Sequence, residues 1–398
     1  MNTDLDPVGA DRAAYRSTLR TWFEQHAPTK GSPEDFSAAH TVTARSNDEY
    51  REREHIAMET TRRWQRSLFD AGLAGRSWPV EYGGAGAPSW QDEAVTEEQA
   101  RWGVSTKMLA IALEMLPPVL FAHGTHEQRA THLPLVLRGE QSWCQLLSEP
   151  DAGSDLGSVT TLAQAVDGGW SVSGQKVWTS GAGSSDYALL IARTDRDTPG
   201  RAGLSCFALD MNQPGVEVRP LRQMSGAYHF NEVFLSEAFV PDMGLIGQLG
   251  QGWMVLRTML LSERKAIGGG TSARSAVQLM ALAKQLGRTV NAVDRQRLVE
   301  TVGRERLLDL LVARIGSGAA VAGAGSLVKL AYSEHARLTA NVAMSILGPL
   351  ATAADATAEP WVERLLFAPG LRLGGGTDEI QRNTLAEQGL GLPREPKR

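Results

Sequence analysis

The sequence predicts an α+β protein with a helical N-terminal domain, a small middle β-barrel or β-sandwich, and a C-terminal four-helix bundle. Apolar residues recur at helical spacing up to about residue 141, short alternating runs follow, and long amphipathic stretches begin near residue 248. At roughly 150 residues per domain, 398 residues suit two or three domains. We therefore expect domains at residues 1–141, 142–247 and 248–398.

The N-terminal third reads as helices separated by clear breaks. Leu68, Phe69 and Leu73 recur at helical spacing, and a second apolar stripe runs from Trp102 to Leu116. Glycine and proline interrupt the pattern around residues 31–33, 78–88 and 117–118.

The middle third reads as short strands. Thr160–Val166 and Trp170–Trp178 alternate apolar and polar residues around Asp167-Gly168, which predicts a tight hairpin. Four more strand-like runs follow: Tyr187–Ala192, Leu204–Met211, Val216–Leu221 and Asn231–Leu235. Such regular spacing is typical of a small barrel or sandwich.

Four amphipathic stretches predict the C-terminal bundle. They begin near Met254, Leu279, Leu298 and Leu327. The small, glycine-rich run Gly316–Gly325 is expected to be a loop between the last two.

Composition excludes several classes of protein. With 40 Lys and Arg against 45 Asp and Glu, nothing favours binding to nucleic acid or to an anionic membrane. Two cysteines, Cys144 and Cys206, exclude a disulfide framework and a cysteine-rich zinc site. His123 and His126 lack a metal-ligand frame, so we expect a surface loop and no metal. Without a secretory signal or an apolar run of about 18 residues, the chain is expected to be soluble and cytoplasmic, with no membrane span.

Three segments stand out as candidates for a binding site. Leu146–Asp155 offers backbone and hydroxyl donors to a phosphate or a polar ring, but reads equally well as a capping turn. Gly174–Gly181 places Trp178 before two hydroxyl residues. That suits a wall beside a planar ligand, although residue type alone favours a core tryptophan. Leu373–Arg382 feeds a glycine run into a helix start, with Thr377 or Asp378 as N-cap.

In this order and across this α–β–α pattern, the three segments resemble the acyl-CoA dehydrogenase family of flavoproteins. The resemblance covers nearly the whole chain. It adds Trp78-Pro79-x-x-Tyr82-Gly83-Gly84, Phe230–Phe234 and Gly389–Pro393. The chain looks like actinobacterial members, including those that act on bulky or steroid-derived acyl-CoAs, and this implies a role in fatty acid or steroid side-chain metabolism.

The resemblance implies FAD bound between the β-domain, the bundle and a neighbouring subunit. It implies an acyl-CoA or acyl-carrier-protein thioester as substrate, electron-transfer flavoprotein as acceptor, and a homo- or hetero-oligomer, either dimer or tetramer. The residues that match the family's motifs, and are therefore expected to bind the cofactor, are Leu147, Ser148, Gly153, Ser154, Trp178, Thr179, Ser180, Thr377 and Glu379. The substrate-binding residues are Ser154, Arg264, Gly375 and Gly376.

The catalytic base is expected at an alternative family position. Most members carry a Glu directly before the Gly-Thr of the third segment, where this chain has Gly375. A minority place it in a Glu-Arg pair on a bundle helix, and Glu263-Arg264 matches that pair. We therefore expect Glu263 to remove the α-proton. On pattern alone, Glu263-Arg264 is a surface pair. The Gly375 N–H remains able to bond the thioester oxygen, and the missing side chain leaves room for a bulky acyl group.

Two departures from the family pattern concern the adenine side of FAD. An Arg-x-x-Phe-Gly segment is absent, and either Arg288 or Arg295 is its possible substitute. The Gln-x-x-Gly-Gly motif that is usual in the family is reduced here to the segment Ser345–Pro349. Two alternatives stay open, and these departures favour the first of them. One is a non-catalytic or partner-dependent subunit of a heteromeric dehydrogenase, and the other is a flavin oxidase or monooxygenase on the same fold.

Overall fold

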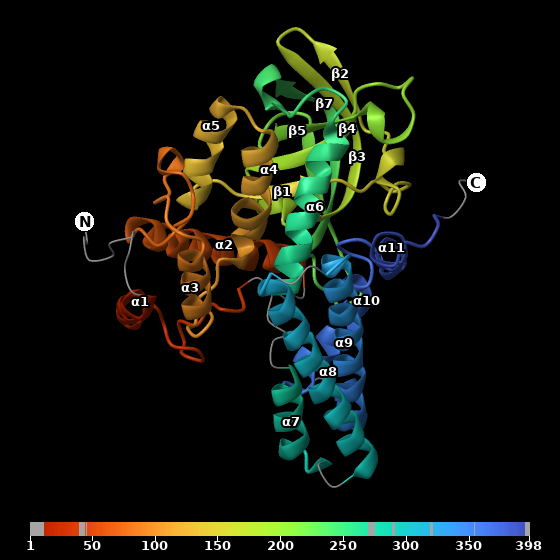
Figure 1. The fold of residues 1–398 in the computed structure, drawn as a ribbon. Helices are drawn as coiled ribbons and strands as arrows, with labels where there is room; N and C mark the ends of the chain where they lie inside the picture. The colour runs from red at the N-terminus through yellow and green to blue at the C-terminus, as the bar shows by residue number, and fades with distance from the viewer. Residues whose placement is uncertain are drawn as a thin grey trace. The chain divides into compact units, whose positions relative to one another are not determined.

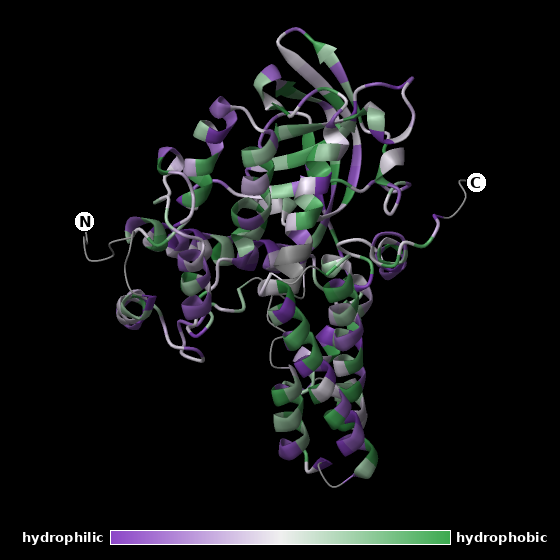
Figure 2. Ribbon diagram, in the orientation of Figure 1, coloured by the Kyte–Doolittle hydropathy of each residue, from purple (hydrophilic) through white to green (hydrophobic). Residues whose placement is uncertain are grey.

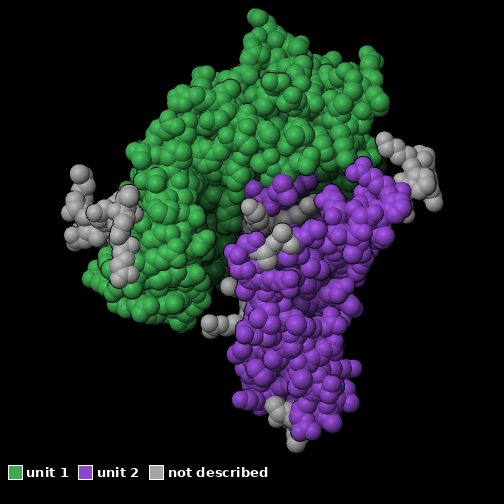
Figure 3. Space-filling view, in the orientation of Figure 1, with its two compact units in different colours: residues 1–259 green, residues 260–398 purple. Residues whose placement is uncertain are grey.

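A computed structural model describes residues 12–39, 44, 46–269, 275–288, 291–318, 321–353 and 355–394, with the backbone alone for residues 264–269. The chain divides into two compact units, Met1–Met259 and Leu260–Arg398 (Figure 3). Each unit is described by itself.

Unit 1 begins with the expected helices (Figure 1). They are α1 (Arg12–His26), α2 (Asn47–Asp70), α3 (Trp90–Gln99), α4 (Leu116–His123) and α5 (His126–Leu137). Ser46 caps α2 by accepting a hydrogen bond from the Glu49 N–H, and Thr125 and Gln128 form a capping box on α5. Phe23 and Leu68 are buried in the core between these helices, because each lies on the apolar stripe of its helix.

The middle of the chain forms one mixed sheet with the order β6-β7-β3-β2-β4-β5-β8, and β1 pairs with β4. The strands are β1 (Trp143–Leu146), β2 (Leu162–Val166), β3 (Gly169–Ser180), β4 (Tyr187–Arg193), β5 (Leu204–Asp210), β6 (Val216–Leu221), β7 (Phe230–Pro241) and β8 (Leu245–Ile246).

The predicted hairpin is confirmed, since β2 and β3 pair antiparallel across Asp167-Gly168. The barrel alternative is not realised: among the described residues the terminal strands β6 and β8 do not pair with each other, so the sheet stays open. Strands β4 and β5 are largely hydrophobic (Figure 2), and their side chains are mostly buried in the core of the sheet domain.

The helix α6 (Gly252–Gly269) follows the sheet in the sequence. Its first residues belong to unit 1 and its last residues to unit 2. Unit 2 continues with α7 (Ser275–Gln285), α8 (Ala292–Gly316), α9 (Ala324–Leu347), α10 (Glu359–Leu371) and α11 (Asp378–Thr384). The apolar stripes of α7, α8, α9 and α10 share one core that includes Leu279, Leu298, Ile346 and Trp361. The predicted loop within Gly316–Gly325 separates α8 from α9.

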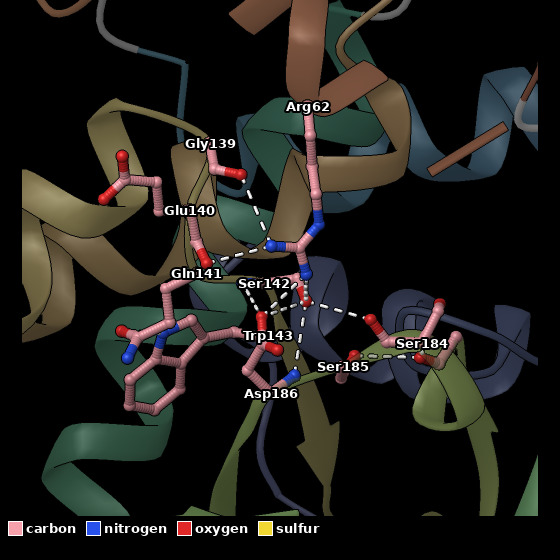
Figure 4. A network of polar contacts seen from close by, with 10 residues as sticks. Arg62, Gly139, Glu140, Gln141, Ser142, Trp143, Ser184, Ser185 and Asp186 are labelled. Atoms are coloured by element: carbon pink, nitrogen blue, oxygen red, sulfur yellow. Dashed lines mark hydrogen bonds and ion pairs between the residues drawn. The ribbon is translucent and has the colours of Figure 1, made fainter. Parts of the chain in front are cut away.

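Arg62 of α2 ties the helical part of unit 1 to the sheet (Figure 4). Its guanidinium donates to the Glu140 carbonyl at 2.9 Å, to Ser142 Oγ at 2.9 Å and to Asp186 Oδ2 at 2.7 Å. Asp186 Oδ2 also accepts from the Ser142 N–H at 2.7 Å, and Ser142 Oγ reaches the Ser184 carbonyl at 2.9 Å. One side chain thus fixes the start of β1 and the turn before β4.

Arg62→Met is expected to lower the free energy of unfolding by about 2–3 kcal/mol, because it leaves charge-assisted hydrogen bonds unmade around a half-buried carboxylate. Urea unfolding followed by circular dichroism measures this change. The matched control is the exposed neighbour Arg63, whose guanidinium donates to Thr60 Oγ1 at 3.3 Å. Arg63→Met should cost about 0.5 kcal/mol or less, and equal losses for the two variants would contradict the assigned role of Arg62.

Candidate active site

The first two candidate segments meet in unit 1. The Val177 N–H donates to the Ser148 carbonyl at 2.9 Å, so the chain after β1 runs beside the end of β3. Lys176 Nζ donates to the Leu147 carbonyl at 3.0 Å. On its other side, Leu147 lines a narrow apolar crevice with Ile191 of β4 and Met259 of α6. The residues assigned to the flavin ring are therefore held by β3 and by apolar packing.

A buried ion pair between Lys176 and Glu149 supports this arrangement. Nζ and Oε1 lie 2.9 Å apart, and the two side chains are 0% and 5% exposed. Glu149 Oε2 accepts from the Thr160 N–H and hydroxyl, and Oε1 accepts from the Thr161 N–H at 2.9 Å. Both carboxylate oxygens are thus satisfied. The sequence pattern did not predict this pair. The signal that the sequence offers is a lysine inside an alternating strand-like run.

The pair shifts the pKa of both groups. Burial raises the pKa of the Glu149 carboxyl, but the Lys176 charge and the hydrogen-bond donors outweigh burial and hold it at about 2. Burial lowers the pKa of Lys176 to about 8, against the opposing attraction of Glu149. Both groups therefore remain charged at neutral pH.

This pair makes unit 1 sensitive to acid. Glu149 has a folded-state pKa below its ordinary 4.5, so its contribution is complete above pH 4.5 and is lost as the pH falls towards 2. Lys176 is protonated in both states throughout that window. Between pH 5 and pH 2, we expect the wild type to lose about 2 kcal/mol more of its unfolding free energy than a Lys176→Met/Glu149→Gln variant. Urea titrations at both pH values measure the difference, and parallel losses would contradict this expectation.

Trp178 adopts a conformation that is rare for a residue other than glycine. Its φ is +62°, and the β3–β7 register shifts between Lys176 and Thr179. Such backbone costs about 1–3 kcal/mol and persists where the surroundings enforce it, often at functional sites. The bulge turns the indole outward to 62% exposure, where it meets the Phe230 ring edge to face. The core position that residue type alone favoured is wrong.

The residues after Trp178 are oriented differently. Thr179 is buried, its carbonyl accepts from Asn231 Nδ2 at 3.0 Å, and its hydroxyl has no partner among the described residues. Ser180 is half-buried and pairs with Phe230. An exposed indole followed by an unpaired buried hydroxyl suits a planar ligand with a polar edge.

Gly153 and Ser154 lie on the exposed part of the first segment. A Cβ built on Gly153 would meet no atom within 4 Å, so packing within the described chain does not require glycine there. An open backbone at this point leaves room for a ligand to approach closely.

The third segment lies in unit 2 and forms a tight glycine loop before α11. Gly375 and Gly376 have φ of +65° and +85°, which only glycine adopts without strain. Their N–H groups have no acceptor among the described residues, while Gln381 Nε2 donates to the Gly375 carbonyl at 2.7 Å. The loop therefore presents unused backbone donors, as the thioester or phosphate role requires.

The two residues expected to meet FAD from this segment differ in exposure. Thr377 is the N-cap of α11, and its hydroxyl accepts from the Ile380 N–H at 3.2 Å, which leaves its own proton for a further acceptor. Glu379 is exposed on the first turn of α11.

A second buried lysine pair anchors this loop. Asp378 Oδ1 lies 2.8 Å from Lys329 Nζ and 2.9 Å from Ser333 Oγ, and Oδ2 lies 2.7 Å from Arg372 Nε. The Asp378 and Lys329 side chains are 1% and 2% exposed. Burial raises the pKa of Asp378, but bonds from Lys329, Arg372 and Ser333 lower it further than burial raises it. The sequence pattern predicted Asp378 only as a possible N-cap and gave no indication of Lys329.

Glu263, the expected base, is half-buried on α6. It follows Met259 by four residues, and this spacing places both side chains on one face of the helix. Met259 is 2% exposed, so that face of α6 is its apolar face. The side chain of Arg264 lies outside what the structure describes, so the surface-pair interpretation stays untested.

On the adenine side, Arg288 and Arg295 are both exposed. A Cβ built on Gly348 would lie 3.6 Å from an Arg288 terminal nitrogen, so Arg288 is beside the reduced glycine motif. Ser345 Oγ instead bonds Arg297 at 2.6 Å and Asp294 Oδ1 at 3.2 Å. The Ser345 hydroxyl is therefore hydrogen-bonded to other residues of unit 2.

The residues of each unit, taken separately, suit one part of a flavin nucleotide. In unit 1, the exposed Trp178 ring offers a flat apolar surface, and the Thr179 hydroxyl has no partner among the described residues. In unit 2, the Gly375 and Gly376 N–H groups have no acceptor among the described residues. An isoalloxazine has a planar face and a polar edge, and its nucleotide tail carries phosphates that suit backbone donors. No group of three potential metal ligands occurs among the described residues, and no described helix is long and apolar enough to cross a bilayer.

Comparison with known families identifies three domains along the chain. Residues 32–140 match the N-terminal domain of acyl-CoA dehydrogenases, residues 144–237 the middle domain and residues 250–390 the C-terminal domain. The chain is 37% identical over 351 residues to acyl-CoA dehydrogenase IpdE1 of Mycobacterium tuberculosis, covering 87% of this chain and 91% of the relative. It is 38% identical over 335 residues to FadE34 of the same species, covering 83% of this chain and 46% of that relative.

Solved structures share the fold. The steroid acyl-CoA dehydrogenase Tcur3481-Tcur3483 aligns with a TM-score of 0.79 at 24% identity, over 97% of this chain and 99% of that one. The ChsE4-ChsE5 complex from Mycobacterium tuberculosis aligns with a TM-score of 0.74 at 22% identity, over 98% and 100% of the two chains. With three family domains matched in order and relatives above 30% identity, the chain belongs to the acyl-CoA dehydrogenase family and is an oxidoreductase of that type.

Proposed function

We propose that this enzyme introduces an α,β double bond into an acyl-CoA or acyl-carrier thioester, with FAD as cofactor and Glu263 as base. The observation that carries the proposal is the joined pair of segments in unit 1, where the Leu147–Ser148 backbone is bonded to β3 beside an exposed, strained Trp178. The family to which the chain belongs is generally FAD-dependent, which supports the cofactor.

Leu147, Ser148, Trp178, Thr179 and Ser180 would hold the flavin ring, with Gly153 and Ser154 close to the ring and to the substrate arm. Thr377 and Glu379 would meet the phosphates or the ribityl chain. When bound, FAD supplies a two-electron acceptor that takes the β-hydrogen with its electron pair.

In the proposed reaction, a Glu263 carboxylate oxygen takes the α-proton. Backbone N–H groups of Gly375 and Gly376 bond the thioester oxygen and stabilise the negative charge that develops there. The α-carbon electron pair forms the new double bond as the β-hydrogen leaves. Ser154 and Arg264 would hold the thioester arm.

The substrate is proposed to be bulky. Gly375 has no side chain beside the reacting carbons, and relatives named for steroid substrates share the fold. Electron-transfer flavoprotein is the proposed electron acceptor, because the family's dehydrogenases require a carrier to reoxidise the flavin.

We also propose that unit 2 associates with a second copy or with a related chain. Helix α8 buries Leu298 and Leu308, yet Val299, Val302 and Leu310 on its other side remain 66%, 40% and 50% exposed. Apolar residues on both sides of a helix are typical of one that is covered twice. Light scattering of the purified protein should give a mass of at least two chains.

The visible spectrum of the purified protein, recorded anaerobically before and after adding saturated acyl-CoAs, tests the proposed function. A flavin band that bleaches with one of them supports cofactor and reaction together. A flavin-free protein when the chain is expressed alone would instead favour the partner-dependent subunit. Rapid reoxidation by oxygen would favour the oxidase or monooxygenase.

A further inference from the structure

We infer that Lys176 is a positioning residue for the flavin: with Glu149, it holds the Leu147–Ser148 backbone and the Trp178 bulge together as one rigid cradle. The inference rests on the proposed function and deepens it. Lys176 touches no proposed reacting group, so its effect on the cofactor passes through the two segments that it joins.

Stability alone does not account for a buried lysine at this position. Replacing a buried ion pair by apolar residues of similar volume is often neutral or stabilising, since both charges must leave water. Lys176 is 0% exposed and Glu149 5%. An apolar side chain would fill the same space in the sheet domain, but it would not donate to the Leu147 carbonyl, which Nζ meets at 3.0 Å.

The lysine fixes the first segment at two neighbouring points. Its ammonium bonds the Leu147 carbonyl and the Glu149 carboxylate, and the next backbone N–H, that of Val177, bonds the Ser148 carbonyl at 2.9 Å. The carboxylate in turn bonds the Thr160 and Thr161 backbone. Residues 147–149 are therefore hydrogen-bonded to β3 on one side and to residues 160–161 on the other. A displacement of β3 would displace them as well.

The same contacts brace the strained tryptophan. Before Trp178, Lys176 and Val177 are bonded to residues 147–149, and after it, the Thr179 carbonyl is bonded to Asn231. A tryptophan whose backbone lies in the left-handed region persists only where the residues before and after it are held in place. Loss of the Lys176 side-chain bonds would leave that flank held only by backbone pairing, through the Val177–Ser148 bond and the β3–β7 register. The indole would then be less firmly pre-set against a planar ligand.

The test uses a charge-free pair, because Lys176→Met alone would leave a buried carboxylate uncompensated and risk unfolding. The variant Lys176→Met/Glu149→Gln keeps side-chain volume and removes both charges. Apoprotein is titrated with FAD, and quenching of flavin fluorescence gives the Kd. We expect a wild-type-like circular dichroism spectrum and a Kd raised about tenfold or more, with an altered shape of the bound flavin's visible band.

Two further variants make the result specific. Val240→Ala creates a cavity in β7 at a residue that is 0% exposed and pairs with Trp170, away from the cradle. It should lower stability yet leave the FAD Kd within about twofold. Thr160→Ala removes one hydroxyl bond to Glu149 and keeps the ion pair, so it tests the cradle even if the double variant fails to fold. It should raise the Kd by about two- to fivefold.

The outcomes separate the two proposals. If the wild type binds FAD and the double variant binds it equally well with an unchanged visible band, the positioning role is overturned and the proposed function stands. If Val240→Ala weakens FAD binding as much as the double variant does, the effect is one of stability and the role is again overturned. If the wild type binds no FAD, the proposed function fails and the inference fails with it.

Discussion

Glu263→Gln is expected to lower the rate of flavin reduction by acyl-CoA by about 10²- to 10⁴-fold while FAD stays bound. A carboxamide has nearly the shape of the carboxylate but takes no proton at neutral pH, and proton transfer by a positioned side chain contributes about that factor. The only other candidate position for a carboxylate in the family pattern is Gly375, which has no side chain.

Anaerobic stopped-flow absorption at the visible flavin band measures this rate directly. The matched control is Glu300→Gln, since Glu300 is an exposed glutamate of α8 paired with Arg304. That variant should reduce its flavin at the wild-type rate. A Glu263→Gln enzyme that retains FAD and reacts normally would exclude Glu263 as the base.

Asp378→Asn is expected to lower the free energy of unfolding of unit 2 by about 3–5 kcal/mol. The substitution keeps the side-chain size but leaves the Lys329 ammonium, 2% exposed, without its carboxylate. It also releases Arg372, whose Nε lies 2.7 Å from Asp378 Oδ2. The Gly375–Gly376 loop lies between Arg372 and Asp378, so loss of this anchor should also loosen the loop.

Differential scanning calorimetry and urea unfolding measure the loss. The control is Lys329→Met/Asp378→Leu, which removes both buried charges and should recover most of the lost stability. Because the pKa of Asp378 is lowered in the folded state, its contribution is complete above its unfolded pKa and fades as the pH falls. The Asp378→Asn protein should therefore differ least from the wild type in acid. A single variant as stable as the double variant at neutral pH would contradict the account.

The local elements could be read from the sequence because neighbouring residues dictate them. Asp167-Gly168 supplies the two-residue turn of the β2–β3 hairpin, and the apolar stretches that begin near Leu298 and Leu327 become α8 and α9. Strand β7 runs on to Pro241, six residues beyond the predicted end at Leu235, because pairing with β3 continues past the alternating run. The sequence did not determine whether the sheet closes into a barrel, because pairing between strands that are distant in the sequence has no local sequence signature in either strand.

The sequence by itself determined the α–β–α order, the three candidate segments and the absence of a carboxylate at Gly375. Only the tertiary structure decided that Lys176 meets Glu149 across 27 positions and Lys329 meets Asp378 across 49. It also decided that Trp178 faces outward, because a register shift between Lys176 and Thr179 turns out a side chain whose residue type favours the core. The physical reason is the same in each case. Turns and helix faces depend on residues a few positions apart, whereas buried charge pairs and bulges depend on partners that only the folded chain brings together.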